Sequence, residues 1–153
     1  MDGAAEAIFA WLRLDDRLTT SGQPTEAQLH ALAAQGVETV INLALHSHEK
    51  ALPDERASVT ALGMDYVHIP VEFSAPAEAD FAAFVAAMEA AKDRRVHVHC
   101  IVNARVSAFV YRWRRDVLGM DEVLARADML RIWDPAAYED GGVWGGFVAP
   151  PPK

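Results

Sequence analysis

The only cysteine in the chain lies in a stretch whose residue types suit the binding of an anion. Cys100 follows the run Val96-His97-Val98-His99, which is typical of a buried strand, and Arg105 stands where a helix is expected to begin. Backbone N–H groups converge at the start of a helix, where the helix dipole is positive, and the loop before it can add further donors. The stretch therefore predicts a site for phosphate or another oxyanion.

The same surroundings suit Cys100 to nucleophilic chemistry. A positive field favours the thiolate over the thiol, and the thiolate is the reactive form. The planar guanidinium of Arg105 can bond two oxygens of one phosphate. The plainer alternative is a buried structural cysteine beside a surface arginine. A position directly after a strand of an α/β sheet favours the chemical interpretation, because ligands bind at that edge.

The elements that must hold this stretch alternate between helix and strand. The spacing of apolar residues, with their caps and stops, predicts helices over about 25–35, 53–62, 77–91, 104–118 and 121–130. Short β-branched runs predict strands at 37–43, 66–71 and 96–99, the last of them central. This order is typical of a single α/β domain, with a mostly parallel central sheet flanked by helices. Residues 134–153 of this 1–153 domain are rich in glycine and proline and are expected to form an irregular C-terminal tail.

The composition limits the compartment and the partners of the protein. A formal charge of −8 disfavours general binding to nucleic acid or to an anionic membrane, so a basic site would have to be local. A single cysteine excludes an intramolecular disulfide, and the first residues lack the pattern of a secretory signal. We therefore expect a cytoplasmic protein without a membrane span, and no protein partner can be named from the sequence.

Four motifs, in their order along the chain, carry a family resemblance. Between about Leu18 and Leu118 the sequence resembles the cysteine-dependent protein tyrosine phosphatase superfamily, in particular its small bacterial dual-specificity-like branch. The motifs are Ser21-Gly22-Gln23-Pro24, Val40-Ile41-Asn42-Leu43, Tyr66-Val67-His68-Ile69-Pro70-Val71, and Val98-His99-Cys100 followed by Arg105. The resemblance implies a protein tyrosine phosphatase-like fold that needs no cofactor.

The resemblance also implies a reaction and a role for each site residue. The substrate would be a phosphomonoester, with phosphotyrosine and phosphoserine among the candidates, and the reaction would pass through a phosphocysteine. Cys100 would attack phosphorus, and His99 would help to keep its thiolate charged. The phosphoryl oxygens would be held by Arg105 and by the loop residues Ile101, Val102, Asn103 and Ala104.

The leaving oxygen of such a substrate needs a proton donor. Glu72 comes directly after Pro70-Val71, where the family usually has an aspartate, and it can act first as acid and then as base. Glu78 and Asp80 are the alternatives. Both fall in the first turn of a predicted helix, where acidic residues are more simply explained as partners of the helix dipole.

The loop departs from the family pattern in its length. Four residues separate Cys100 from Arg105, whereas the family has five, so the loop is expected to lose one N–H donor. Losing one such donor typically costs about 2.7–4 kcal/mol of transition-state stabilisation, which predicts weak turnover. Asn103 tolerates positive φ in place of the usual glycine, and Ser107 stands one position after the family's hydroxyl residue. The alternative is a catalytically silent phosphate-binding or regulatory pseudophosphatase.

The histidines raise the question of a metal site. His97 and His99 share one face of a predicted strand, with His46, His48 and His68 elsewhere in the chain. The spacing of ligands that marks a metal site is missing from the sequence, and histidines of an interior strand are often oriented by hydrogen bonds. We therefore expect no metal.

Overall fold

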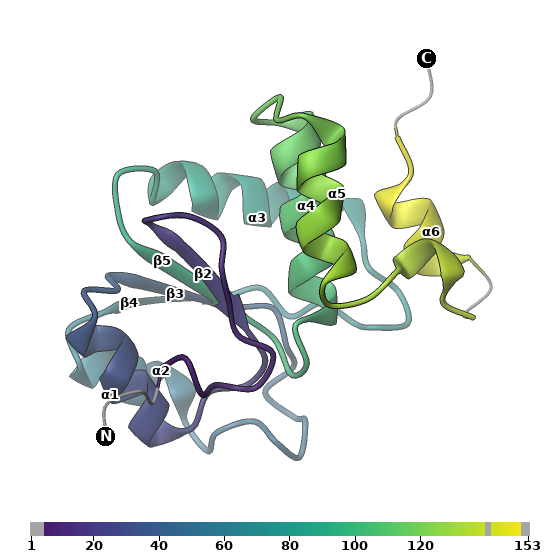
Figure 1. Ribbon diagram of the computed structural model, residues 1–153. Coiled ribbons are helices and arrows are strands. Elements are labelled where there is room, and N and C mark those ends of the chain that lie inside the picture. Colours follow the sequence, from purple (N-terminus) through teal and green to yellow (C-terminus); the bar gives the residue numbers. More distant parts are fainter. Residues whose placement is uncertain (1–4, 140–141, 151–153) are drawn as a thin grey trace.

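A five-stranded sheet lies between two layers of helices in the computed structural model, which describes residues 5–139 and 142–150 (Figure 1). The strand order is β1-β2-β5-β3-β4, and all neighbours are parallel except β1 and β2. The strands are β1 (Leu12–Arg13), β2 (Leu18–Ser21), β3 (Thr39–Asn42), β4 (Asp65–His68) and β5 (Val96–His99). The predicted α/β class, the mostly parallel sheet and the central position of 96–99 are confirmed.

The register of the sheet brings four strand ends to one level. His99 pairs with Ser21 on one side and with Asn42 on the other, and Asn42 pairs with His68. The residues that follow these strands therefore meet at the carboxyl edge of the sheet, where α/β domains bind ligands.

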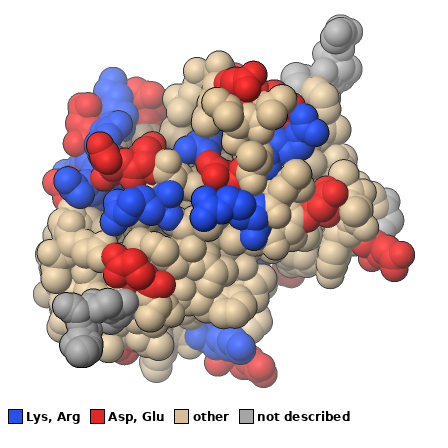
Figure 2. Space-filling view, viewed as in Figure 1, with Lys and Arg blue, Asp and Glu red and all other residues tan. Residues whose placement is uncertain are grey.

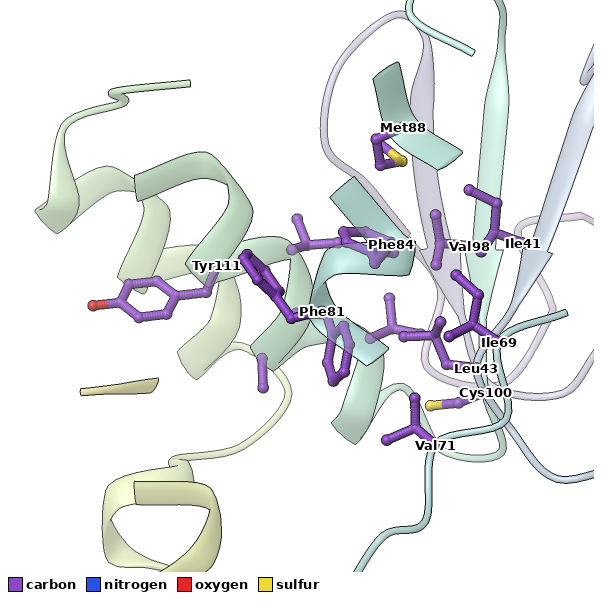
Figure 3. Packing of buried hydrophobic residues seen from close by; sticks show 14 of the residues in the cluster. Ile41, Leu43, Ile69, Val71, Phe81, Phe84, Met88, Val98, Cys100 and Tyr111 are labelled. Atoms are coloured by element: carbon purple, nitrogen blue, oxygen red, sulfur yellow. The ribbon is translucent and has the colours of Figure 1, made fainter. Parts of the chain in front are cut away.

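The helices cover both faces of the sheet. The helices α1 (Glu26–Ala34) and α2 (Glu55–Ala61) pack on one face, around Leu29, Leu32 and Val59. The other face carries α3 (Glu78–Ala90), α4 (Ala104–Asp116), α5 (Glu122–Leu130) and α6 (Val143–Val148). Its larger core includes Ile41, Phe84 and Val98 (Figure 3). The first two turns of α4 are buried on all sides, because this helix lies between the sheet and the outer helices α5 and α6.

The ends of the helices follow the expected caps. Thr25 and Gln28 form both bonds of a capping box at the start of α1, at 3.1 and 2.9 Å, and Asp54 caps α2. Gly36 takes a positive φ of 94° after α1, as a C-terminal glycine stop does.

Two parts of the fold differ from the expectation. The strands β1 and β2 were not expected, because neither shows an alternating or continuous apolar run, and β2 buries Thr19 and Thr20. The segment after Trp133 is not simply an irregular tail, since it forms the 3₁₀ turn Pro135–Ala137 and α6. Burial of the large aromatic side chains of this segment outweighs the flexibility of its glycines. Residues 140, 141 and 151–153 lie outside the described residues.

Basic and acidic side chains lie beside one another on the surface. On the face shown in Figure 2 they are intermixed. Among the ion pairs of the structure, one joins Arg94 to Asp65 and another joins Arg112 to Glu78. In the part of the chain that the structure describes, no helix has the length and apolar character needed to cross a membrane.

Candidate active site

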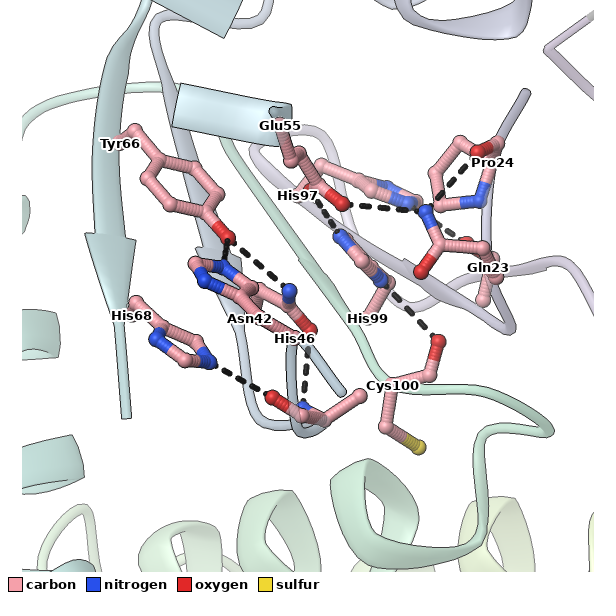
Figure 4. Close-up of polar contacts among 12 residues, drawn as sticks. Gln23, Pro24, Asn42, His46, Glu55, Tyr66, His68, His97, His99 and Cys100 are labelled. Carbon is pink, nitrogen blue, oxygen red and sulfur yellow. Dashed lines mark hydrogen bonds and ion pairs between the residues drawn. The ribbon is translucent and has the colours of Figure 1, made fainter. Parts of the chain in front are cut away.

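Cys100 lies at the carboxyl end of the central strand β5, directly before the loop that leads into α4 (Figure 4). Its side chain is fully buried, in the hydrophobic cluster that includes Leu43 and Val71 (Figure 3). The thiol therefore lies in the core, and Cys100 directly precedes the loop that was predicted to bind phosphate.

The loop is held against the segment that connects β2 to α1. The backbone N–H of Gln23 donates to the carbonyl oxygen of Ile101 at 3.0 Å. Gly22 makes this approach possible, because a Cβ at this position would lie 2.3 Å from the Ile101 oxygen. The Ser21-Gly22-Gln23-Pro24 motif thus has a physical role, which is to set the position of the Cys100 to Arg105 loop.

Asn103 turns the loop into the helix. Its φ of 70° is left-handed, as the sequence indicated that this residue could tolerate, and its side-chain amide donates to Ala10 O and Thr20 Oγ1. The first hydrogen bond of α4 runs from the Ser107 N–H to the Asn103 carbonyl. The N–H groups of the three residues between them precede that bond, so they have no partner within the helix and can serve an anion.

Four of the expected site residues line one cavity of about 360 Å³. They are Glu72, Ile101, Val102 and Arg105, and the remaining lining residues are Leu45, His48 and Phe73. Arg105 is buried, and its Nη1 donates to the carbonyl oxygen of Val71 at 2.9 Å. The carboxylate of Glu72 comes from the same segment as this carbonyl. The fold therefore brings an acid and a guanidinium to one cavity beside the loop.

The two alternative acids have other partners. Glu78 forms a two-pronged ion pair with Arg112, and the hydrogen bonds from Arg112 lower the pKa of Glu78. Asp80 accepts a bond from the Ala77 N–H at the start of α3. Asp80 thus caps the start of α3, as its sequence position favoured, whereas Glu78 joins α3 to α4.

Ser107 makes a local bond within α4. Its buried hydroxyl donates to the Ala104 carbonyl oxygen at 3.0 Å. This is the back-bonding that serine often makes in a helix, and it leaves the hydroxyl directed at the backbone.

A buried ion pair that the sequence did not reveal lies next to Cys100. His99 Nε2 is 2.5 Å from Glu55 Oε2, and both side chains are fully buried. Gln23 Nε2 donates to the other oxygen of Glu55 at 3.1 Å (Figure 4). Glu55 is the first residue of α2, so its position in the sequence looked like that of an ordinary dipole partner.

The hydrogen bonds of Glu55 and His99 indicate the charge of each side chain. Burial would raise the pKa of the Glu55 carboxyl, but the hydrogen bond and charge of His99, with the bond from Gln23, hold this pKa below its ordinary value. The other ring nitrogen of His99 is 3.1 Å from the Cys100 carbonyl oxygen, which can only accept. With an ionised Glu55, both ring nitrogens of His99 are donors and the ring is positive. The arrangement places a buried positive charge beside Cys100.

Four further histidines make hydrogen bonds, namely His46, His48, His68 and His97. His97 contacts the hydroxyls of Thr19 and Ser21 at 2.8 and 2.7 Å, and burial holds its pKa well below the ordinary value, so the ring is neutral. His46 and His68 stack with their ring centroids 3.7 Å apart. Among residues 5–139 and 142–150, no three histidine, cysteine or acidic side chains are grouped in a way that could hold a metal ion.

Comparisons with known proteins agree with this geometry. A family model described as "DSP-PTPase phosphatase fused to NAD+ Kinase" matches residues 11–136. The crystal structure of a DUF442 protein from Shewanella putrefaciens CN-32 is 36% identical, with a TM-score of 0.82 over 97% of this chain and 94% of that one. A cysteine-to-serine variant of P. aeruginosa TpbA in complex with pTyr is 20% identical and shares the fold, with a TM-score of 0.70 over 92% of this chain and 83% of that one.

Curated relatives are longer than this chain. The Beta-lactamase hydrolase-like protein of Agrobacterium fabrum is 38% identical over 92 residues, which are 58% of this chain and 21% of that protein. The protein of the same description from Xylella fastidiosa is 33% identical over 95 residues, 60% of this chain and 22% of its own length. The chain thus aligns with about a fifth of these relatives. The resemblance to cysteine-dependent protein tyrosine phosphatases is confirmed, and the chain belongs to the family of DSP-PTPase phosphatases described as fused to NAD+ kinase.

Proposed function

We propose that the protein hydrolyses a phosphomonoester, with Cys100 as the nucleophile. The observation that carries this proposal is the cavity where Glu72 and Arg105, from two separate segments, meet the loop between Cys100 and α4. The phosphoryl group would be held by the N–H groups at the start of α4 and by the guanidinium of Arg105. A bound phosphate would take over the donor that Arg105 now directs to the Val71 carbonyl.

The reaction would proceed in two balanced steps. The thiolate of Cys100 attacks phosphorus, the bond from phosphorus to the ester oxygen breaks, and Glu72 gives its proton to that oxygen. Water then attacks the phosphocysteine while the Glu72 carboxylate takes a proton from it. The bond from sulfur to phosphorus breaks, which releases inorganic phosphate and restores the thiolate.

A leaving-group series tests the role of Glu72. Glu72→Gln should slow hydrolysis of phenyl phosphate by about a hundredfold, because general acid catalysis is typically worth at least that much. It should slow 4-nitrophenyl phosphate much less, because nitrophenolate leaves without a proton. The matched control is Glu49→Gln, in an exposed glutamate outside the cavity, which should leave both rates unchanged. The comparison uses kcat/KM, which reports the first step alone, because loss of the base in the second step would slow both substrates. An equal fall in kcat/KM for both substrates would remove Glu72 from the acid role.

A phosphate-binding protein without turnover is the second candidate. The Cys100 side chain is fully buried, and the loop is one residue shorter than the family pattern. A thiol that stays buried would leave a site that binds phosphate but cannot attack it. Protection of Cys100 from alkylation by phosphate, together with no hydrolysis of any aryl phosphate, would favour this candidate.

A further inference from the structure

A second concave surface adjoins the cavity of the proposed active site. It is an open groove of about 700 Å³, lined by Phe9, Gln23, Pro24, Thr25, Glu26, Ala27, Lys50, Leu52, Ile101 and Val102. Two of its apolar side chains are well exposed, since Phe9 is 64% exposed and Val102 is 47% exposed. Exposed large apolar side chains in a groove are typical of a binding surface.

The groove and the cavity share part of their lining. Ile101 and Val102 line both hollows, so they form the rim between them. Consider a ligand whose phosphoryl group lies beside Arg105. To reach the groove it must pass over Val102, so it must be longer than the side chain or small molecule that carries the phosphate. A small aryl phosphate would end near the rim.

The charges around the two hollows limit the kind of ligand that fits. The cavity has one cation and one carboxylate, Arg105 and Glu72, and the groove likewise has Lys50 and Glu26. The loop residues between Cys100 and Arg105 carry no charge. A ligand with several phosphates needs several cations, and an anionic membrane would meet a chain of net charge −8. An apolar segment of polypeptide matches this surface better.

We propose that the groove binds the residues next to the phosphorylated residue of a polypeptide substrate and selects apolar side chains there. This inference rests on the proposed function, because it takes the cavity at Arg105 as the place of the phosphoryl group. Phe9 and Leu52 are then specificity residues, and neither contacts the reacting atoms.

Two phosphotyrosyl peptides test the proposal, one with leucine and one with glutamate on both sides of the phosphotyrosine. The wild-type protein should show a kcat/KM about tenfold higher for the leucine peptide, since partial burial of such side chains is worth about that factor. Phe9→Ser and Leu52→Ser should each lower kcat/KM for the leucine peptide several-fold and leave 4-nitrophenyl phosphate hydrolysis within twofold. Leu124→Ser, in an exposed leucine of α5 outside both hollows, is the matched control and should change neither rate.

The outcomes separate this proposal from the proposed function. The role of the groove would be overturned, with the proposed hydrolysis intact, by equal kcat/KM values for the two peptides. It would also be overturned if the Phe9→Ser and Leu52→Ser variants kept the preference for the leucine peptide. Absence of all hydrolysis would instead overturn the proposed function, and the same variants would then be compared by the Kd of the leucine peptide. If the wild-type protein bound phosphatidylserine vesicles and Phe9→Ser abolished this binding, the groove would be assigned to a membrane and the peptide proposal would be overturned.

Discussion

The charge on His99 links a helix on one face of the sheet to the proposed nucleophile on the strand. Glu55 at the start of α2 holds one ring nitrogen, and the other nitrogen donates to the carbonyl of Cys100 itself. A positively charged imidazole at this place favours the thiolate form of Cys100. The ion pair is thus placed to keep Cys100 reactive at neutral pH.

Glu55→Gln tests that link. The variant replaces the charged partner of His99 with a neutral amide, so the buried ion pair is lost and Cys100 should become less reactive. We expect alkylation of Cys100 by the uncharged reagent iodoacetamide to slow by about tenfold at pH 6, because the thiolate is the form that reacts. The measurement is the pH profile of the alkylation rate, compared with that of Glu49→Gln in an exposed position. A folded Glu55→Gln protein with an unchanged profile would show that the pair has no effect on the thiol.

The residues of this site differ in how far the sequence reveals them. The positions of Cys100 and Arg105, after β5 and at the start of α4, could be predicted because a lone cysteine after a buried strand and an arginine at a helix start form a local pattern. Glu55 could not, because the contact with His99 joins residues 44 positions apart and depends on how α2 packs against the sheet. The spacing of apolar and polar residues around Glu55 does not distinguish a buried glutamate from an exposed one.

At the scale of elements, the position of the loop depends on the contact between the end of β2 and the loop itself. Gly22→Ala would place a Cβ against the Ile101 carbonyl, so the backbone of one segment must shift. We expect a loss of about 1–3 kcal/mol in the free energy of unfolding, as in other overpacked sites, and weaker protection of Cys100 by phosphate. Denaturant unfolding and alkylation with and without phosphate measure the two effects.

A matched glycine provides the control for this prediction. Gly146 lies within α6, and a Cβ added there would meet no other atom within 4 Å beyond the backbone of its own helix, so Gly146→Ala should be neutral or stabilise by up to about 1 kcal/mol. Phosphate protection of Cys100 should not change in this variant. If Gly22→Ala behaved like Gly146→Ala, the close contact with Ile101 would not set the position of the loop.

The elements themselves could be predicted as far as local pattern reaches. The helix 77–91 was expected from Phe81, Phe84 and Met88 at helical spacing, and the structure has α3 over Glu78–Ala90 with all three buried. The strand β2 was missed because its burial comes from pairing with β5 and from hydrogen bonds between its hydroxyls and His97. Such long-range partners leave no periodicity in the sequence.

At the scale of the whole molecule, the buried His97 makes stability depend on pH. Its pKa in the folded state is well below the ordinary value, whereas the unfolded chain takes up a proton near pH 6.5. Below that pH the unfolded state therefore binds more protons than the folded state, and the free energy of unfolding falls as the pH is lowered. His97 contributes a slope of up to about 1.4 kcal/mol per pH unit.

His97→Gln isolates this contribution. The variant should unfold more easily at pH 7, because it disturbs the bonds to Thr19 and Ser21, but its stability should fall less steeply between pH 6.5 and 5. Urea unfolding at several pH values gives the two slopes. Parallel curves for the wild type and the variant would show that His97 is not the group that titrates.

The central claim is that Cys100 becomes phosphorylated during turnover, and rapid acid quenching with mass spectrometry tests it most directly. Wild-type protein is mixed with 4-nitrophenyl phosphate, quenched within milliseconds, digested and compared with Cys100→Ser treated in the same way. We predict one phosphoryl group on the peptide that contains Cys100, and no phosphate release by the folded Cys100→Ser variant. Phosphate release by both proteins at equal rates, with no phosphoryl group on Cys100, would contradict the claim.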